Sequence, residues 1–168
     1  MNGLTTRAAA PADAAAMVAI YRAGIEDRVA TFETVPPTES EMAALAASRT
    51  PVVVAERDGD VVAWARIGPY SDPHDYYAGV GEATLYVARG ARGAGVGREL
   101  MLALEPVADE AGFHKLVGKI FTTNAASIAL VRACGWHDVG VHRRHGRLDG
   151  EWKDVLVVEK LLSARSGP

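Results

Sequence analysis

The chain has 168 residues and a mass of 17.8 kDa, which is the size of one domain with a core of its own. Eighteen basic and 21 acidic side chains give a net charge of −3, so nothing predicts binding to nucleic acid or an anionic membrane. A single cysteine excludes an intrachain disulfide and a cysteine-rich zinc site, and the five histidines lack metal-ligand spacing. We expect one soluble, cytoplasmic, metal-free domain over residues 1–162, followed by a short polar tail at 163–168.

The first half of the chain predicts two helices and three strands. Apolar residues at near-helical spacing predict a helix over residues 12–27 with one buried face. Thr38 and Glu41 have the spacing of a capping box, which predicts a second helix over residues 38–48. Asp58-Gly59 between two apolar runs predicts a β-hairpin. The strands expected in this half are residues 4–8, 51–57 and 60–67.

The second half alternates strands with helices after a polar, aromatic loop at 69–79. A glycine-rich turn precedes an amphipathic helix that ends near residue 111, and Asn124 caps a further helix that Gly135 ends. The strands expected here are residues 82–87, 115–121, 139–145 and 152–161. Early antiparallel strands followed by helical crossovers predict an α/β (or α+β) fold with a mixed sheet.

The sharpest local signal is the turn Arg92-Gly93-Ala94-Gly95-Val96-Gly97-Arg98 between a strand and a helix. Such a turn lets consecutive backbone N–H groups face one anion, and the helix N-terminus adds positive potential. Arg98-Glu99 replaces the Lys-Ser/Thr of a P-loop, and the glycine spacing and position do not fit a dinucleotide fingerprint. A tight strand–helix connection with no ligand remains the alternative.

Two segments in this order resemble the motifs of the GCN5-related N-acetyltransferase (GNAT) superfamily. One is Arg-x-x-Gly-x-Gly at residues 92–97 after Leu85-Tyr86-Val87, and the other is Asn124-Ala-Ala-Ser-Ile-Ala-Leu130 with Gly135-Trp136 downstream. The resemblance implies the GNAT fold, with a mixed sheet of about seven strands and about four flanking helices. It also implies acetyl-CoA as co-substrate.

A closer resemblance extends from Thr6 to Leu161, to the phosphinothricin, methionine sulfoximine and arsinothricin acetyltransferase branch. The segments that carry it are Ile20-Tyr21, Ala30-Thr-Phe-Glu33, Pro36-Pro37, Gly68-Pro69, Glu82-Ala-Thr-Leu-Tyr86-Val87, Gly112-Phe-His-Lys115 and Gly150-Glu-Trp-Lys-Asp-Val155. The branch implies acetyl-CoA-dependent N-acetylation of small glutamate-like amino acids by a homodimer.

The resemblance assigns a role to each matching residue. Glu82 is implied as the general base, since an ammonium must lose a proton before it attacks a thioester. The backbone of Leu85 and Val87 is implied to hold the pantetheine arm. The complete set of implied cofactor-binding residues is Leu85, Tyr86, Val87, Arg92, Gly93, Ala94, Gly95, Val96, Gly97, Arg98, Asn124 and Ser127.

The chain departs from the branch at positions that concern the leaving group and the acceptor. Val131 stands where related enzymes carry a tyrosine or histidine proton donor, and Asp149 replaces a histidine before the Gly150–Val155 segment. The loop at 70–77 lacks the arginine expected for an anionic acceptor, and Arg66 is a candidate replacement, or else an ordinary surface charge. The other candidate acceptor-binding residues are Phe32, Tyr76 and Tyr77.

Several interpretations stay open from the sequence. The acceptor is alternatively another amine, such as a polyamine, an aminoglycoside or a protein N-terminus, and the chain is alternatively a non-catalytic acyl-CoA-binding module. The basic segment His142–Arg147 is read as an exposed strand or as a contact with an acidic substrate or a dimer partner. Cys134 is interpreted as a packed core residue in preference to an acyl-accepting nucleophile.

Overall fold

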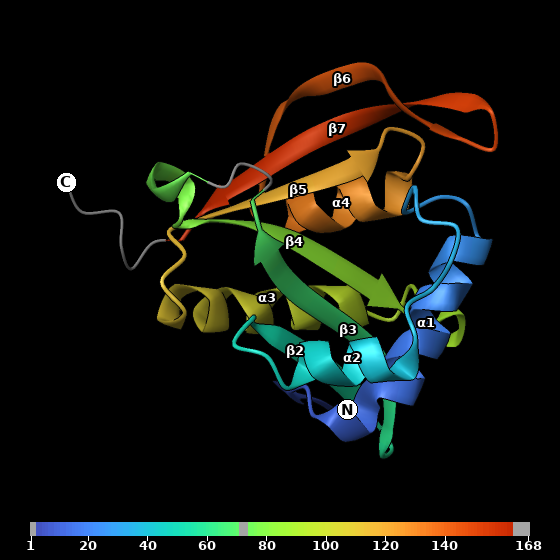
Figure 1. Cartoon of the computed structure of the whole chain (residues 1–168), viewed down its shortest axis with the longest axis vertical. Coiled ribbons are helices and arrows are strands. Elements are labelled where there is room, and N and C mark those ends of the chain that lie inside the picture. The colour runs from blue at the N-terminus through green and yellow to red at the C-terminus, as the bar shows by residue number, and fades with distance from the viewer. Residues whose placement is uncertain (1–2, 71–73, 163–168) are drawn as a thin grey trace.

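The computed structural model, described for residues 3–70 and 74–162, is one seven-stranded mixed sheet with helices on both faces (Figure 1). All neighbouring strands are antiparallel except β4 and β5, which are parallel. The strands, in sheet order, are β1 (Leu4–Ala8), β2 (Val52–Arg57), β3 (Asp60–Pro69), β4 (Val80–Val87), β5 (Lys115–Phe121), β7 (Glu151–Leu161) and β6 (His137–Leu148). The predicted fold class is confirmed. Tail residues 163–168 and loop residues 71–73 lie outside the described residues.

Three of the four helices begin where the sequence predicts, and α1 begins two residues later than predicted, at Ala14, because residues 11–13 form a 3-10 turn. Thr38 Oγ1 accepts a hydrogen bond from the Glu41 N–H, and the Glu41 carboxylate accepts one from the Thr38 N–H, which confirms the capping box. Asn124 Oδ1 accepts a hydrogen bond from the Ser127 N–H, which confirms the second cap. The helices are α1 (Ala14–Glu26), α2 (Glu39–Ala46), α3 (Val96–Glu110) and α4 (Ala125–Ala133), with 3-10 turns η1 (Pro11–Asp13), η2 (Asp75–Tyr77) and η3 (Arg89–Ala91).

Each face of the sheet has its own apolar core. Helices α1 and α2 cover one face, where Met17 and Met42 pack against Trp64 and Tyr86. The Trp64 indole N–H is buried and donates to the Met17 carbonyl oxygen at 3.1 Å. Helices α3 and α4 cover the other face, and Leu100 and the other buried residues of α3 fill that core. Because both faces of the sheet are packed against helices, its central strands are held rigidly. The ends of these strands can therefore position the side chains of a site.

The last hairpin is longer than predicted. Strand β6 starts at His137 and continues to Leu148, where Asp149 and Gly150 both adopt left-handed backbone conformations that close a tight turn. The register of β6 against β7 shifts between His142 and Gly146, which places a bulge in the strand. Among the described residues, no helix is long and apolar enough to cross a bilayer.

Candidate active site

The two parallel strands at the centre of the sheet separate after a short paired stretch. Pairing between β4 and β5 ends at Glu82 and Val117, whereas β4 stays paired with β3 as far as Val87 and β5 with β7 as far as Phe121. Figure 1 shows the strands starting together and diverging, β4 toward α1 and β5 toward α4. The sheet therefore opens into a V whose edges carry unpaired backbone groups.

The backbone of β4 presents Leu85 and Val87 to this opening. The Ala88 N–H donates to the Val62 carbonyl oxygen at 2.9 Å, and hydrogen-bonded residues alternate along an antiparallel pair. The N–H and C=O groups of Leu85 and Val87 consequently point away from β3, toward β5. Arg92 Nε already donates to the Val87 carbonyl oxygen at 3.0 Å. Hydrogen-bonding groups of Leu85 and the Val87 N–H thus remain facing the V.

The glycine-rich turn closes the open end of the V. Gly93 and Gly95 have φ values of 74° and 80°, and no atom lies within 4 Å of where a Cβ would stand on either. Gly95 is the N-cap of α3, whose first N–H groups have no partner within the helix. A Cβ on Gly97 would stand 3.0 Å from Leu130, so glycine there lets α3 approach α4. The turn provides amides and positive helix potential suited to an anion.

A cleft of about 420 Å³ lies between the turn, β4 and α4. The structure gathers all the residues predicted to bind the cofactor around this cleft except Ala94. Its lining includes Leu85, Tyr86, Val87, Arg92, Gly93, Gly95, Val96, Gly97, Arg98, Asn124 and Ser127. Residues far apart in the sequence are thus brought to one cleft.

Asp27, at the end of α1, anchors the turn through two arginines. Arg89 Nη2 and Arg92 Nη1 lie 2.8 and 2.7 Å from its carboxylate oxygens. These hydrogen bonds, from Arg89 first, hold the pKa of the Asp27 carboxyl below its usual range. The sequence assigned Arg92 to the cofactor, whereas its side chain here binds Asp27 and the Val87 carbonyl. Asp27 itself was missed, since nothing near it in the sequence indicates arginine partners so far along the chain.

Asn124 joins α4 to the segment between α1 and α2. Its Oδ1 caps α4, and its Nδ2 donates to the Val29 carbonyl oxygen at 3.1 Å. Both ends of the side-chain amide are therefore engaged within the protein. The predicted contact of Asn124 with the cofactor stays a prediction, and its observed role is to hold the wall of the cleft.

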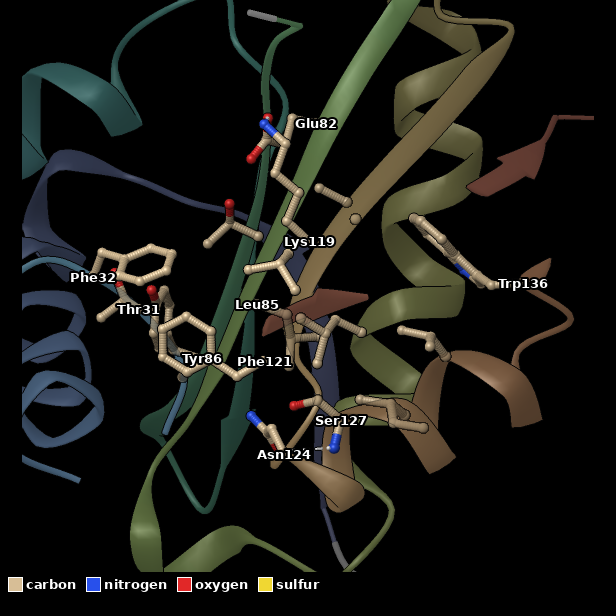
Figure 2. A pocket seen from close by; sticks show the side chains of 18 of the residues that line it. Thr31, Phe32, Glu82, Leu85, Tyr86, Lys119, Phe121, Asn124, Ser127 and Trp136 are labelled. Atoms are coloured by element: carbon tan, nitrogen blue, oxygen red, sulfur yellow. Dashed lines mark hydrogen bonds and ion pairs between the residues drawn. The ribbon is translucent and has the colours of Figure 1, made fainter. Parts of the chain in front are cut away.

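A second cleft of about 280 Å³ adjoins the first and contains the predicted base. The two clefts share Leu85, Tyr86 and Asn124 in their linings. Glu82 lies in this second cleft, where its Oε2 accepts a hydrogen bond from Lys119 Nζ at 2.8 Å (Figure 2). The carboxylate therefore has a cationic partner from the opposite arm of the V.

Aromatic rings form the wall opposite Glu82. Phe32, from the segment after α1, meets Phe121 edge-to-face with ring centroids 4.7 Å apart, and both line the second cleft. Tyr86 packs against Tyr21 and Trp64. Burial raises the pKa of the Tyr86 phenol above its ordinary value. Phe32 thus lines the same cleft as Glu82, and its contact with an acceptor stays a prediction.

The other predicted acceptor residues lie outside this cleft. Arg66 lines a neighbouring hollow of about 510 Å³ with Thr84 and Tyr86, beneath α2. Tyr77 lines a hollow at the opposite, closed end of the V, and Tyr76 is 71% exposed beside His74. The structure does not bring Tyr76 and Tyr77 to Glu82, because their loop precedes β4 where β4 and β5 are still paired.

Two further features noted in the sequence have defined places. His142 to Arg147 form the bulged part of the exposed strand β6, and His145 from this segment lines the cleft of Glu82. Cys134 is buried in the core, and burial raises the pKa of its thiol. A thiol held protonated in the core is a poor nucleophile, which supports the packing interpretation.

Sequence reasoning missed Lys119, and it considered His145 only as part of the basic segment His142–Arg147. Glu82 pairs with Val117 across the parallel strands, and alternate residues of a strand share a face, so Lys119 and Glu82 point the same way. The pairing of Glu82 with Val117 is what indicates that Lys119 lies beside Glu82. The sequence does not give this strand register, so Lys119 could not be found from it. His145 reaches the cleft through a bulge that the local sequence does not specify.

The family assignment follows from comparison with known proteins. Residues 17–136 match the model of the acetyltransferase (GNAT) family, which is more than half of the chain. The chain therefore belongs to this family of acetyltransferases, as the two sequence motifs predicted. Among the described residues, no group of three or more His, Cys, Asp and Glu side chains is placed to hold a metal ion.

Individual relatives place the chain near one branch of the family. It is 34% identical to a phosphinothricin N-acetyltransferase from Alcaligenes faecalis, over 95% of this chain and 83% of that protein. It is 31% identical to an L-methionine sulfoximine/L-methionine sulfone acetyltransferase from Pseudomonas paraeruginosa, over 96% of this chain and 97% of that protein. The resemblance to this branch is thereby confirmed.

Solved structures agree on the fold. A phosphinothricin acetyltransferase from Sinorhizobium meliloti in complex with acetyl-CoA superposes with a TM-score of 0.87 and 31% identity, covering 95% of this chain and 88% of that one. A ribosomal-protein-alanine N-acetyltransferase from Brucella melitensis superposes with a TM-score of 0.88 and 36% identity, covering 94% and 99%. These proteins act on different kinds of amine, so likeness alone does not choose the acceptor.

Proposed function

We propose that this chain transfers the acetyl group of acetyl-CoA to the primary amine of a small amino acid or analogue resembling phosphinothricin or methionine sulfoximine. One observation carries the proposal. The V between β4 and β5 joins a cleft bordered by free helix-terminal amides to a cleft that holds Glu82 and aromatic walls. The first suits a diphosphate and its thioester arm, and the second suits a small amine.

In the proposed reaction the diphosphate lies on the amides of the Arg92–Arg98 turn. The pantetheine arm follows β4, where the groups of Leu85 and Val87 that face the V offer hydrogen bonds. This places the thioester carbonyl near the meeting point of the two clefts. A backbone N–H at Leu85 or Val87 then donates to the oxyanion that develops on that carbonyl.

Glu82 acts as the general base. It takes a proton from the acceptor ammonium through water, and the free amine attacks the thioester carbonyl. The new C–N bond forms, the C–S bond breaks, and the thiolate of coenzyme A leaves. The second proton of the amine leaves the nitrogen as the tetrahedral intermediate collapses, and it reaches the thiolate through water. Val131 has no proton to give and is buried in the core, so the thiolate leaves with the help of water.

The acceptor class rests on the branch and on the size of the second cleft. Relatives that share about a third of their residues with this chain act on small amino-acid analogues. A cleft of about 280 Å³ between Phe32 and Lys119 suits a molecule of that size. Arg66, in the adjoining hollow, remains the candidate for an anionic group of the acceptor.

A second acceptor class has support from one comparison. The Brucella melitensis structure that is 36% identical to this chain is a ribosomal-protein-alanine N-acetyltransferase. A protein N-terminus as acceptor would need a groove open to an extended peptide. The hollow lined by Pro36 and Arg66 shares Thr84 and Tyr86 with the cleft of Glu82, and it is the part of the surface that such a peptide would follow.

We also propose that the chain forms a homodimer, as the branch implies. Strand β6 is an edge of the sheet, and Val139 and Val141 on it are 57% and 50% exposed. Apolar side chains on an unpaired edge favour association with another surface.

The experiment is a thiol-release assay with acetyl-CoA and a panel of amines. The panel contains phosphinothricin, methionine sulfoximine, methionine sulfone, a polyamine, an aminoglycoside and a peptide that begins with alanine. We expect the amino-acid analogues to give the highest kcat/KM. A higher kcat/KM for the peptide would indicate that a protein N-terminus is the acceptor. Thiol release no faster than the background hydrolysis of acetyl-CoA, with every amine, would indicate a non-catalytic binding module.

A further inference from the structure

Lys119 brings an amine of the protein itself into the acceptor cleft. Its Nζ lies 2.8 Å from Glu82 Oε2, and both side chains are about one-third exposed. Figure 2 shows the Lys119 side chain reaching from β5 across the gap to Glu82 on β4. Exposed ion pairs of this kind contribute no more than about 1 kcal/mol. The pair therefore adds little to the stability of the fold, and its main effect is to hold the Lys119 amine beside Glu82.

The position of this amine matches that of an acceptor. In the proposed function, on which this inference rests, Glu82 removes a proton from an ammonium in the second cleft. The Lys119 ammonium is already hydrogen-bonded to that carboxylate, and it shares the cleft with Leu85, beside which the thioester is proposed to lie. We propose that Lys119 is a self-acetylation site: without an acceptor, the chain transfers acetyl from acetyl-CoA to Lys119 Nζ.

The chemistry is that of the acceptor reaction. Glu82 takes one proton from the Lys119 ammonium and passes it to solvent, and the neutral amine attacks the thioester carbonyl. The Nζ–C bond forms and the C–S bond breaks. The second proton leaves the nitrogen as the intermediate collapses and ends on the thiolate of coenzyme A. The products are N-acetyl-lysine, coenzyme A and one proton, and no further reactant is needed.

Acetylation would change the cleft in a defined way. The neutral amide of acetyl-lysine no longer forms an ion pair with Glu82, and its added carbonyl and methyl group occupy space between Glu82 and Phe32. A bound acceptor fills the same space, so acceptor and Lys119 compete for the thioester. Self-acetylation should consequently slow when the acceptor is present.

The chain supplies matched controls for this proposal. It contains only four lysines, and each is paired with a glutamate. The three pairs other than that of Lys119 line neither cleft. These control pairs are Lys115–Glu159, Lys153–Glu151 and Lys160–Glu105. All four lysines thus have a glutamate partner, and Lys160 also donates to the Cys134 carbonyl oxygen, but only Lys119 lines a cleft.

The test is a time course of purified chain with acetyl-CoA in a buffer without amines, followed by peptide mass spectrometry. We expect the acetyl mass to appear on Lys119 at least about tenfold faster than on each of the other three lysines, given the rate effect of a general base. Glu82→Gln should bring Lys119 to the rate of the others. The chain unfolded in denaturant should show four similar rates.

A parallel thiol-release assay with the amine panel separates the outcomes. Acceptor turnover together with equal acetylation of all four lysines would overturn the self-acetylation site and leave the proposed function standing. Selective acetylation of Lys119 with no turnover of any amine would support the site and overturn the proposed acceptor class. Selective acetylation that persists unchanged in Glu82→Gln, or neither activity, would overturn this inference.

Discussion

The ring of Phe32 lies against the backbone of Gly146, so closely that a Cβ on that glycine would stand 2.6 Å from the ring. This contact joins the segment after α1 to the bulged part of β6. Phe32 also packs on Phe121, at the end of β5. One aromatic side chain thus connects three parts of the chain that border the second cleft.

Replacing Phe32 by alanine should impair acceptor binding. We expect Phe32→Ala to raise the acceptor KM about tenfold, which corresponds to about 1.4 kcal/mol, and to leave the Kd of coenzyme A within twofold. Steady-state kinetics and calorimetry measure the two quantities. Tyr76→Ala is the control, because Tyr76 lies away from the cleft. If Tyr76→Ala raised the acceptor KM more than Phe32→Ala did, the result would indicate that the loop at 70–77 contacts the acceptor.

Alanine at Gly95 should affect both folding and cofactor binding. Its φ of 80° is left-handed, so Gly95→Ala should lower the free energy of unfolding by about 1–2 kcal/mol. The new methyl group would also enter the space proposed for the diphosphate, and we expect the Kd of coenzyme A to rise at least about tenfold. Gly90→Ala is the matched control: space is open at Gly90 too, but its φ is not left-handed. Equal behaviour of the two variants would contradict the role of the turn.

Loss of the Asp27 carboxylate should loosen the turn. Asp27→Asn weakens the pairs with Arg89 and Arg92, and we expect the Kd of coenzyme A to rise about fivefold, as for the loss of about 1 kcal/mol. Asp138→Asn breaks the Arg132–Asp138 pair, which lines neither cleft, and should leave the Kd unchanged. Calorimetric titration measures both Kd values. The same Kd of coenzyme A in Asp27→Asn and Asp138→Asn would contradict the anchoring role of Asp27.

Acid should destabilise the chain partly through Asp13. Asp13 is 8% exposed, and the hydrogen bonds from Arg7 hold the pKa of its carboxyl below the usual range. A lowered folded-state pKa means that this contribution is present above about pH 4 and is lost as the pH falls through the folded-state value.

Asp13→Asn should accordingly lower the free energy of unfolding by about 1–3 kcal/mol at pH 7. The difference from the parent chain should shrink below pH 4, and urea unfolding across the pH range measures it. A difference that stays constant down to pH 2 would show that the Asp13 charge is not the cause.

Most of the fold was predictable because its signals are local. Thr38 with Glu41 and the Asn124 cap fix the starts of α2 and α4 within a few residues of sequence. Asp58-Gly59 fixes the first hairpin in the same way. The grouping of the residues around the first cleft was predictable as well, because most of them belong to one continuous turn.

The second cleft and the anchoring of the turn were less predictable, because they depend on strand register and on contacts between residues far apart in the sequence. Lys119 meets Glu82 only once the parallel pairing of β4 with β5 is known. Asp27 meets Arg92 only once α1 has packed on the sheet. The loop with Tyr76 and Tyr77 precedes Glu82 closely in the sequence, yet it lies at the closed end of the V.

The most direct test of the account is the single-turnover rate of acetyl transfer in Glu82→Gln, measured at saturating acetyl-CoA with the best amine of the panel. Glutamine preserves the shape of the side chain and removes its basicity. We predict that the rate falls about 10²–10⁴-fold while the Kd of coenzyme A stays within twofold of the parent value. Transfer at the parental rate would contradict Glu82 as the base and, with it, the proposed chemistry of the site.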